Sequence, residues 1–245
     1  MRSARPLCAA GAAVVLVGAS GCVTTQQRNT RAKLRATRLL ASRGPLIVTR
    51  RNLDVRVDGL ALLSGAGGTA IVVRLANVSG GTLTDLPISV GIVAGGRRTY
   101  LNRRAGLEYF QRHVAAIRGR GRVTWVFTTR RPIGARGRPF ALVGAPAVPP
   151  VSHAGTLPGL VASALATPAA TRPGLVRVRV RNPTQVPQYG LVVYALARSG
   201  GRYVAAGRAT VADLGTNSAA TVDLKLVGSP RREPVELEVL PTIFQ

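Results

Sequence analysis

Residues Val176-Arg177-Val178-Arg179-Val180-Arg181-Asn182 alternate strictly between aliphatic and charged side chains. Successive side chains of a β-strand point to opposite faces, so a period of two predicts a strand with one buried and one solvated face. The same alternation occurs in Val235-Glu236-Leu237-Glu238-Val239, where we expect the two glutamates to face solvent. No segment after residue 45 shows a sustained helical period, and these patterns together favour an all-β fold.

The pattern of strands and turns occurs twice in the chain. Residues 71–77, 86–90 and 95–97 correspond to 176–182, 191–195 and 200–202 at an offset of 105. A second block, 117–127, corresponds to 214–224 at an offset of 97. Because the offset falls, the first copy should hold about eight additional residues between Gly96 and Ile117.

Each copy is about 100 residues of short aliphatic runs that are separated by Gly, Asn, Pro and Ser, which is typical of a sandwich of about seven strands. The repeated unit resembles immunoglobulin-like and fibronectin-III-like extracytoplasmic domains of bacteria, over residues 46–245. In such domains a strand ends in Asn and a polar turn follows, and Asn77 and Asn182 occupy that position in the two copies. We therefore predict two tandem Ig-like β-sandwich domains, 46–147 and 148–245, with a proline-rich boundary at 145–150.

The N-terminus has the features of an export signal. Arg2 and Arg5 precede an apolar stretch of 16 residues, which is shorter than the roughly 20 that a membrane-spanning helix needs. The stretch ends in Ala19-Ser20-Gly21-Cys22, which resembles the lipobox of bacterial lipoproteins. The resemblance implies a diacylglycerol on the Cys22 thiol and cleavage that removes residues 1–21 as the signal peptide. Residues 23–45 hold six basic and no acidic side chains, which predicts a flexible basic tether over 22–45. Ala19 stands where the family usually has Leu, and an ordinary secretory signal is the alternative.

This interpretation places the protein in the cell envelope, outside the cytoplasm and bound to the membrane by its lipid. The chain has two cysteines, Cys8 and Cys22. The first would leave with the signal peptide and the second would carry lipid, so we expect no disulfide in the mature protein. We expect no cofactor either.

The formal net charge is +25, and the larger share of the positive charge falls in residues 46–147. Such a charge favours polyanions, either anionic envelope polymers or acidic lipid head groups. Aromatic residues make up only 4% of the chain, which makes nucleic acid an unlikely partner. The alternative is that the arginines reflect codon usage and simply solvate outward strand faces, as expected for Arg177, Arg179 and Arg181. The candidate anion-binding residues are Arg97, Arg98, Arg103, Arg104, Arg118, Arg120 and Arg122.

The segment 97–113 holds the densest set of functional side chains, with five arginines, two tyrosines, a phenylalanine and a histidine. One hypothesis is a basic loop that clamps phosphate or carboxylate groups. The other, which we favour, is a hydrophobic plug in which Leu107, Tyr109 and Phe110 cover an end of the sandwich. Separately, we expect Trp125 to be a core residue of the first copy and not a binding platform.

Signatures of catalysis are missing from the sequence. There is neither a G-x-S-x-G elbow nor a phosphate-binding G-x-x-x-x-G-K-[ST] motif, and His113 and His153 lack the spacing of metal ligands. We therefore expect no catalytic residues, no metal site and no enzymatic activity. The leading hypothesis is a lipid-anchored envelope protein that presents its domains for protein binding or assembly. The alternatives are a polyanion-binding module and an enzyme with a dispersed site.

Overall fold

The computed structural model describes residues 26–27, 30–31, 33–34, 37, 46–65, 67–133, 137–146, 157–165, 174–230 and 233–242. The signal peptide, Cys22, the segment 147–156 with His153 and most of the basic tether lie outside the described residues. Every strand pair in the described part is antiparallel, and one 3₁₀ turn, η1 (Tyr109–Gln111), interrupts the strands. The predicted all-β fold of Ig-like sandwich type is confirmed.

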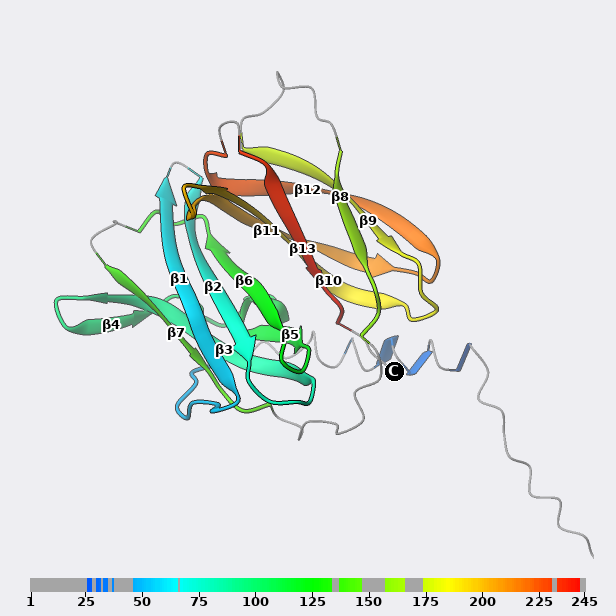
Figure 1. Cartoon of the computed structure of the whole chain (residues 1–245), viewed down its shortest axis with the longest axis horizontal. Coiled ribbons are helices and arrows are strands. Elements are labelled where there is room, and N and C mark those ends of the chain that lie inside the picture. Colours follow the sequence, from blue (N-terminus) through cyan, green and yellow to red (C-terminus); the bar gives the residue numbers. More distant parts are fainter. Residues whose placement is uncertain are drawn as a thin grey trace, which may run out of the picture.

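The first domain is a sandwich of two sheets (Figure 1). One sheet has the order β1-β2-β6. In the other, β3 pairs with β4 and β5 along one edge and with β7 along the opposite edge. The strands are β1 (Val55–Gly65), β2 (Gly68–Asn77), β3 (Leu83–Ala94), β4 (Arg97–Tyr100), β5 (His113–Ile117), β6 (Arg122–Thr129) and β7 (Arg138–Val143).

The strands of the second domain follow one another in the order β13-β10-β11-β12-β9-β8. Strands β11 and β12 pair only over Ala205–Gly207 and Leu226–Gly228, so the path divides into two sheets, β13-β10-β11 and β12-β9-β8. The strands are β8 (Val161–Ala164), β9 (Leu175–Asn182), β10 (Gln188–Ser199), β11 (Arg202–Leu214), β12 (Ser218–Gly228) and β13 (Val235–Leu240).

Strand register is the same in the two domains. Leu75 pairs with Val123 in the first domain, and Val180 pairs with Ala220 in the second. Val180 follows Leu75 by 105 residues and Ala220 follows Val123 by 97, which are the two offsets of the sequence repeat. The pair Leu83–Ile117 likewise corresponds to Gln188–Leu214. Strands β4 and β5 together occupy the place of the single long strand β11, because the additional residues of the first domain lie between them.

Asn77 and Asn182 close equivalent turns in the two domains. The Asn182 amide donates to the carbonyls of Val186 and Gly215, both at 2.9 Å, and its Oδ1 accepts from the Thr184 hydroxyl at 2.7 Å. Asn77 makes the corresponding bonds, its amide donating to Gly81 O at 2.7 Å and Arg118 O at 3.1 Å. Both asparagines are buried, and each ties a strand end to the turn before β6 or β12.

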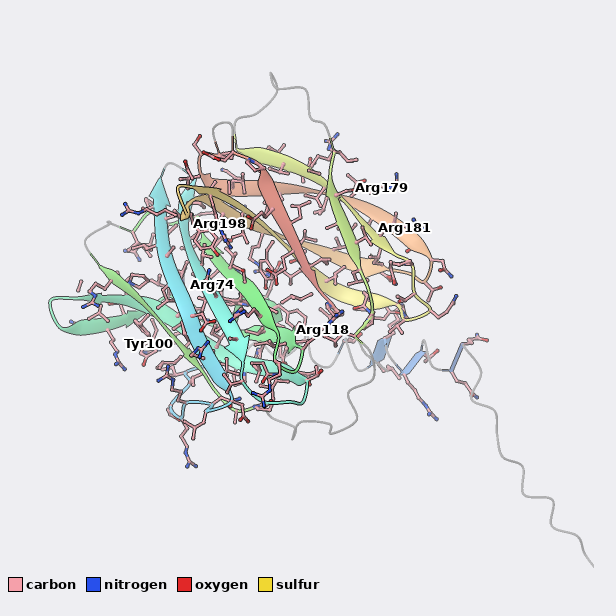
Figure 2. All side chains as sticks on the ribbon, in the orientation of Figure 1. Arg74, Tyr100, Arg118, Arg179, Arg181 and Arg198 are labelled. Carbon is pink, nitrogen blue, oxygen red and sulfur yellow. The ribbon has the colours of Figure 1, made fainter. Side chains whose placement is uncertain are left out.

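The predicted strand at residues 176–182 has the expected faces. Val178 and Val180 are fully buried in the core of the second domain, whereas Arg177, Arg179 and Arg181 are exposed. Figure 2 shows Arg179 and Arg181 at the outer side of the molecule, on β9. The alternation therefore reflects a sheet with one solvated face.

The two sheets nearest the middle of the molecule are covered on both faces. In β10, Leu191, Val193 and Ala195 pack into the second domain's own core. The intervening Val192, Tyr194 and Leu196 pack into the core of the first domain. The sheet β13-β10-β11 thus lies against β1-β2-β6, with contacts of β11 to both β2 and β6, and the molecule has four sheet layers (Figure 1).

Candidate functional site

The seven candidate arginines are all exposed, but the fold does not bring them together as one cluster. Arg97 and Arg98 lie on β4, which pairs with the C-terminal end of β3. Arg118 and Arg120 follow β5, which pairs with the N-terminal end of β3 through Leu83. Figure 2 shows this separation by the places of Tyr100 on β4 and Arg118 after β5. Twelve residues of strand separate the two groups.

Few of these arginines have an acidic partner within the described ranges. Arg122 lies 3.3 Å from Asp58, which also pairs with Arg56, and both guanidiniums help to hold the pKa of that carboxyl below its usual value. Arg98 lies over the ring of Phe140 at 5.6 Å from its centroid. The remaining candidates lie on a solvated basic surface, and of them only Arg104 lines either of the two cavities described below.

The inserted segment of the first domain contains a hydrophobic plug. Tyr109 and Phe110 are buried in η1, and Leu107 packs against them from the side. Trp125 is fully buried beneath the plug, and its Nε1 donates to the carbonyls of Phe110 and His113, both at 3.2 Å. The plug hypothesis and the core position of Trp125 are both confirmed.

Polar groups fasten this plug to β3. The Tyr109 hydroxyl donates to Asp85 at 2.5 Å, and burial together with this bond raises the pKa of the phenol. The ring of His113 stacks on Tyr109 with centroids 4.0 Å apart, and burial lowers the pKa of the imidazole. Asp85 adopts a left-handed φ of 54°, a conformation that Asp tolerates better than most residues. We assign this group a structural role, because its members bond to one another.

A row of three polar side chains crosses the apolar contact between the domains. Tyr194 on β10 pairs in register with Glu238 on β13 and with Arg208 on β11, so the three side chains lie side by side on the face toward the first domain. Glu238 accepts from the backbone N–H of Thr124 at 2.9 Å and 3.1 Å. The expectation that Glu238 faces solvent is therefore wrong, because a second sheet covers that face of its strand.

Glu238 is the titratable group with the clearest consequence for this contact. Burial raises the pKa of its carboxyl to about 7, an effect that the Thr124 N–H and Arg198 only partly offset. Tyr194 beside it is fully buried, and burial raises the pKa of its phenol as well. Around neutral pH the contact between the domains therefore changes its charge.

Arg208 is the other charged member of the row, and its side chain is only 5% exposed. Its Nη2 lies 3.1 Å from Glu108 Oε2 of the first domain, and the same oxygen accepts from the Thr210 hydroxyl at 3.0 Å. Among the described residues, no group forms a hydrogen bond of good geometry with Arg208 Nε or Nη2. A buried guanidinium with so few partners is costly, which makes its surroundings a candidate site.

Two cavities adjoin Arg208 at the boundary between the domains. The first has a volume of about 370 Å³ and is lined by Glu108, Tyr109 and Phe110 facing Val192 and Thr210. The second has a volume of about 490 Å³ and a basic lining. Its residues are Gly67, Arg104, Leu107, Gln111, Phe127, Thr128, Thr129, Arg130, Arg208, Lys225 and Val227. We call this second cavity the basic cleft.

The contact between the domains was missed from the sequence, although a signal for it was present. Residues 70–73, Ala-Ile-Val-Val, and 191–197, Leu-Val-Val-Tyr-Ala-Leu-Ala, are apolar without alternation. A strand that is apolar at every position is typical of a sheet buried on both faces. Both stretches are fully buried in the structure, in β2 and β10.

Metal-ligand clusters and membrane-spanning helices are both absent from the described residues. No group of three or more His, Cys, Asp and Glu side chains there could hold a metal ion. No helix within the same ranges combines the length and apolar character needed to cross a membrane.

Comparisons with known proteins find similar solved structures but no matching family. No model of a known protein family matches the chain, and a search of curated proteins also found none. The chain is similar to part of red sea bream transglutaminase, with 16% identity over 78% of this chain and 32% of that one, at a TM-score of 0.22. It is also similar to part of the C-terminal globular domain of an oligosaccharyltransferase from Pyrococcus abyssi, with 9% identity over 85% and 51% of the two chains and a TM-score of 0.22. The chain thus spans well under two thirds of either structure.

The expectation that the chain is not an enzyme is corrected by these comparisons. It rested on missing sequence signatures, and one of the similar structures named above is an enzyme, a transglutaminase. Missing signatures do not by themselves exclude catalysis. The likeness itself, at a TM-score of 0.22, assigns no reaction to this chain.

Replacing Glu238 by Gln should remove a pH-dependent term from the free energy of unfolding. Because folding raises the pKa of Glu238 to about 7, the folded state binds the proton more tightly, and stability is lost as pH rises from the ordinary value of 4.5 through 7. The amide that replaces the carboxyl keeps an oxygen for the Thr124 N–H and carries no charge. We expect the variant to gain stability over the wild type as pH rises from about 5 to about 8, as measured by urea denaturation.

The quantity to compare is the difference in free energy of unfolding between the wild type and Glu238→Gln. His113, whose pKa is lowered in the folded state, adds stability as pH rises in both proteins, so its contribution cancels in that difference. Glu236→Gln, at an exposed glutamate two positions away, is the matched control. It should stay close to the wild-type pH profile, because its charge is the smallest of the causes that raise or lower the pKa of Glu238. Parallel profiles for wild type and Glu238→Gln would contradict the assignment.

Proposed function

We propose that the chain is a lipid-anchored protein of the cell envelope whose two sandwich domains act as one rigid unit that presents a binding surface to a protein partner. The observation that carries this proposal is the packing of β10 and β11 on the first domain, where Val192, Tyr194 and Leu196 join the core of the other sandwich. Domains that share a core hold a fixed relative orientation, in contrast to sandwiches joined only by a linker.

Strand β4 of the first domain offers an edge that suits a partner. Strand β4 pairs with β3 on one side only, and the hairpin that they form with Gly95 and Gly96 at its tip projects from the first domain (Figure 1). An exposed edge offers unpaired backbone groups to a strand of another protein. Arg97, Arg98 and Thr99 are exposed along this edge, and their charge would select an acidic segment.

The anchor belongs to the same proposal. The segment Ala19-Ser20-Gly21-Cys22 resembles a lipobox, and two acyl chains on Cys22 would hold the protein at the membrane, since each buried methylene contributes about 0.8 kcal/mol. The basic tether that follows would add attraction to anionic lipid head groups. The rigid pair would then stand at the membrane surface with the more basic domain nearer to it.

A second candidate function is the binding of an extended polyanion, such as an anionic envelope polymer, by the first domain. The specific observation in its favour is that exposed arginines occur at both ends of β3, with Arg118 and Arg120 at one end and Arg97 and Arg98 at the other. A small anion could not reach both groups, whereas a polymer chain or a charged surface could contact both at once.

Substitution of Cys22 by Ser should release the protein from the membrane. The serine hydroxyl cannot form the thioether, so the acyl mass and the cleavage before residue 22 should both be lost. Mass spectrometry of the N-terminal peptide and fractionation of membranes measure the two effects. Membrane association that survives the substitution, with an unchanged acyl mass, would show that the lipoprotein assignment is wrong.

Binding to an anionic polymer should depend steeply on salt if the second candidate is correct. Exposed charge pairs are screened over about 8 Å at physiological ionic strength, so affinity for the polymer should fall sharply between low and physiological salt. Arg118→Gln together with Arg120→Gln should weaken it further. The matched control is Arg179→Gln with Arg181→Gln, which removes the same charge from the outer sheet of the second domain. Equal weakening by both pairs, or no binding at low salt, would reject this function.

A further inference from the structure

The basic cleft lies between the domains and is built from both of them. The first domain contributes Arg104 from the inserted segment and Arg130 from the end of β6. The second contributes Arg208 from β11 and Lys225 from β12. Its described lining thus holds four cationic side chains and no carboxylate. Neither domain alone could form it.

Arg208 shows that the cleft is more than a patch of surface charge. Its side chain is almost fully buried, and Nε has no hydrogen-bond partner among the described residues. Glu108 lies beside Nη2 in the neighbouring cavity and offsets part of the charge. Arg208 lines the cleft and places a largely buried positive charge beside it, which favours an anion there.

The remaining lining suits a molecule with a polar and a less polar part. Leu107, Phe127 and Val227 supply apolar surface. Gln111, Thr128 and Thr129 supply polar groups near the cations. The volume of about 490 Å³ falls in the range of small-molecule sites, roughly 300–1,000 Å³.

Close packing of the two domains fixes the shape of the cleft. Gly67, in the turn between β1 and β2, lies so close to β12 that an added Cβ would be 3.2 Å from the carbonyl oxygen of Leu226. Lys225 is the residue before Leu226, so this tight contact places its strand at the edge of the cleft. The cations are therefore held by the same packing that joins the domains.

We propose that the basic cleft binds a small molecule through an oxyanion group, a phosphate or a carboxylate, with Arg208 at its base and Arg104, Arg130 and Lys225 at its rim. Guanidinium groups match the geometry of both oxyanions, and an anion in the cleft would offset the charge of the buried Arg208. This site is distinct from the partner surface on β4 and from the arginines at the two ends of β3.

The test is calorimetric titration of the purified chain carrying Cys22→Ser with inorganic pyrophosphate in one arm and citrate in the other. At least one probe should bind with a dissociation constant of about 1 mM or tighter and raise the melting temperature. Lys225→Gln and Arg104→Gln remove exposed side chains and should leave the fold intact. Each should weaken binding about tenfold, the loss expected for a charged hydrogen bond. The arm with the tighter binding identifies phosphate or carboxylate as the preferred group.

Arg103→Gln and Arg202→Gln are the matched controls, because both residues are exposed cations outside the cleft lining. They should change the affinity by less than about twofold, as expected for a change in net charge alone. Arg208→Gln should abolish binding, and its melting curve shows whether the variant is folded. Failure of both probes to bind at about 10 mM, or equal weakening by the cleft variants and the controls, would overturn the proposal.

Discussion

Packing on both faces of the sheet β1-β2-β6, most complete along β2 and β6, joins the two domains. One face packs on β3 and η1 within its own domain, and the other packs on β10 and β11 of the second domain. A sheet with both faces covered needs apolar residues at every position, which the run Ala70-Ile71-Val72-Val73 provides. The two domains therefore fold as sandwiches and also join as a unit of four sheet layers.

Polar groups at this contact set how the domains meet. The row of Glu238, Tyr194 and Arg208 crosses an otherwise apolar surface, and each end of the row is matched by the first domain, by the Thr124 N–H at one end and Glu108 at the other. Apolar packing alone tolerates sliding of one sheet on the other, whereas these bonds are lost if the register changes. Burial in this row raises the pKa of Glu238 and leaves Arg208 with few hydrogen-bond partners. The residues that set the orientation of the domains therefore also contribute to the proposed anion site.

Much of the fold could be predicted from the sequence, because the strand pattern is local. The alternation at residues 176–182 gave the correct faces, and the spacing of Asn77 and Asn182 matched the equivalent turns in the structure. The site was harder, since it depends on contacts between domains. Alternation shows that Glu236 and Glu238 share a face but does not show what covers that face. The candidate arginines are close in sequence, yet β3 holds them at opposite ends. Arg208 and Lys225 stood out in no sequence pattern, and only the packing of β11 and β12 places them beside Arg104 and Arg130.

We infer that the two sandwiches form one rigid body, and the distance between a probe in each of them can be measured to test this. Spin labels at cysteines introduced for Thr99 on β4 and Thr221 on β12, both exposed, place one probe in each domain of a chain whose Cys8 and Cys22 are replaced by serine. Pulsed electron spin resonance should give a single narrow distribution of distances, because packing at Val192, Tyr194 and Leu196 fixes the domains. A broad distribution, as from domains that move about a linker, would contradict the account.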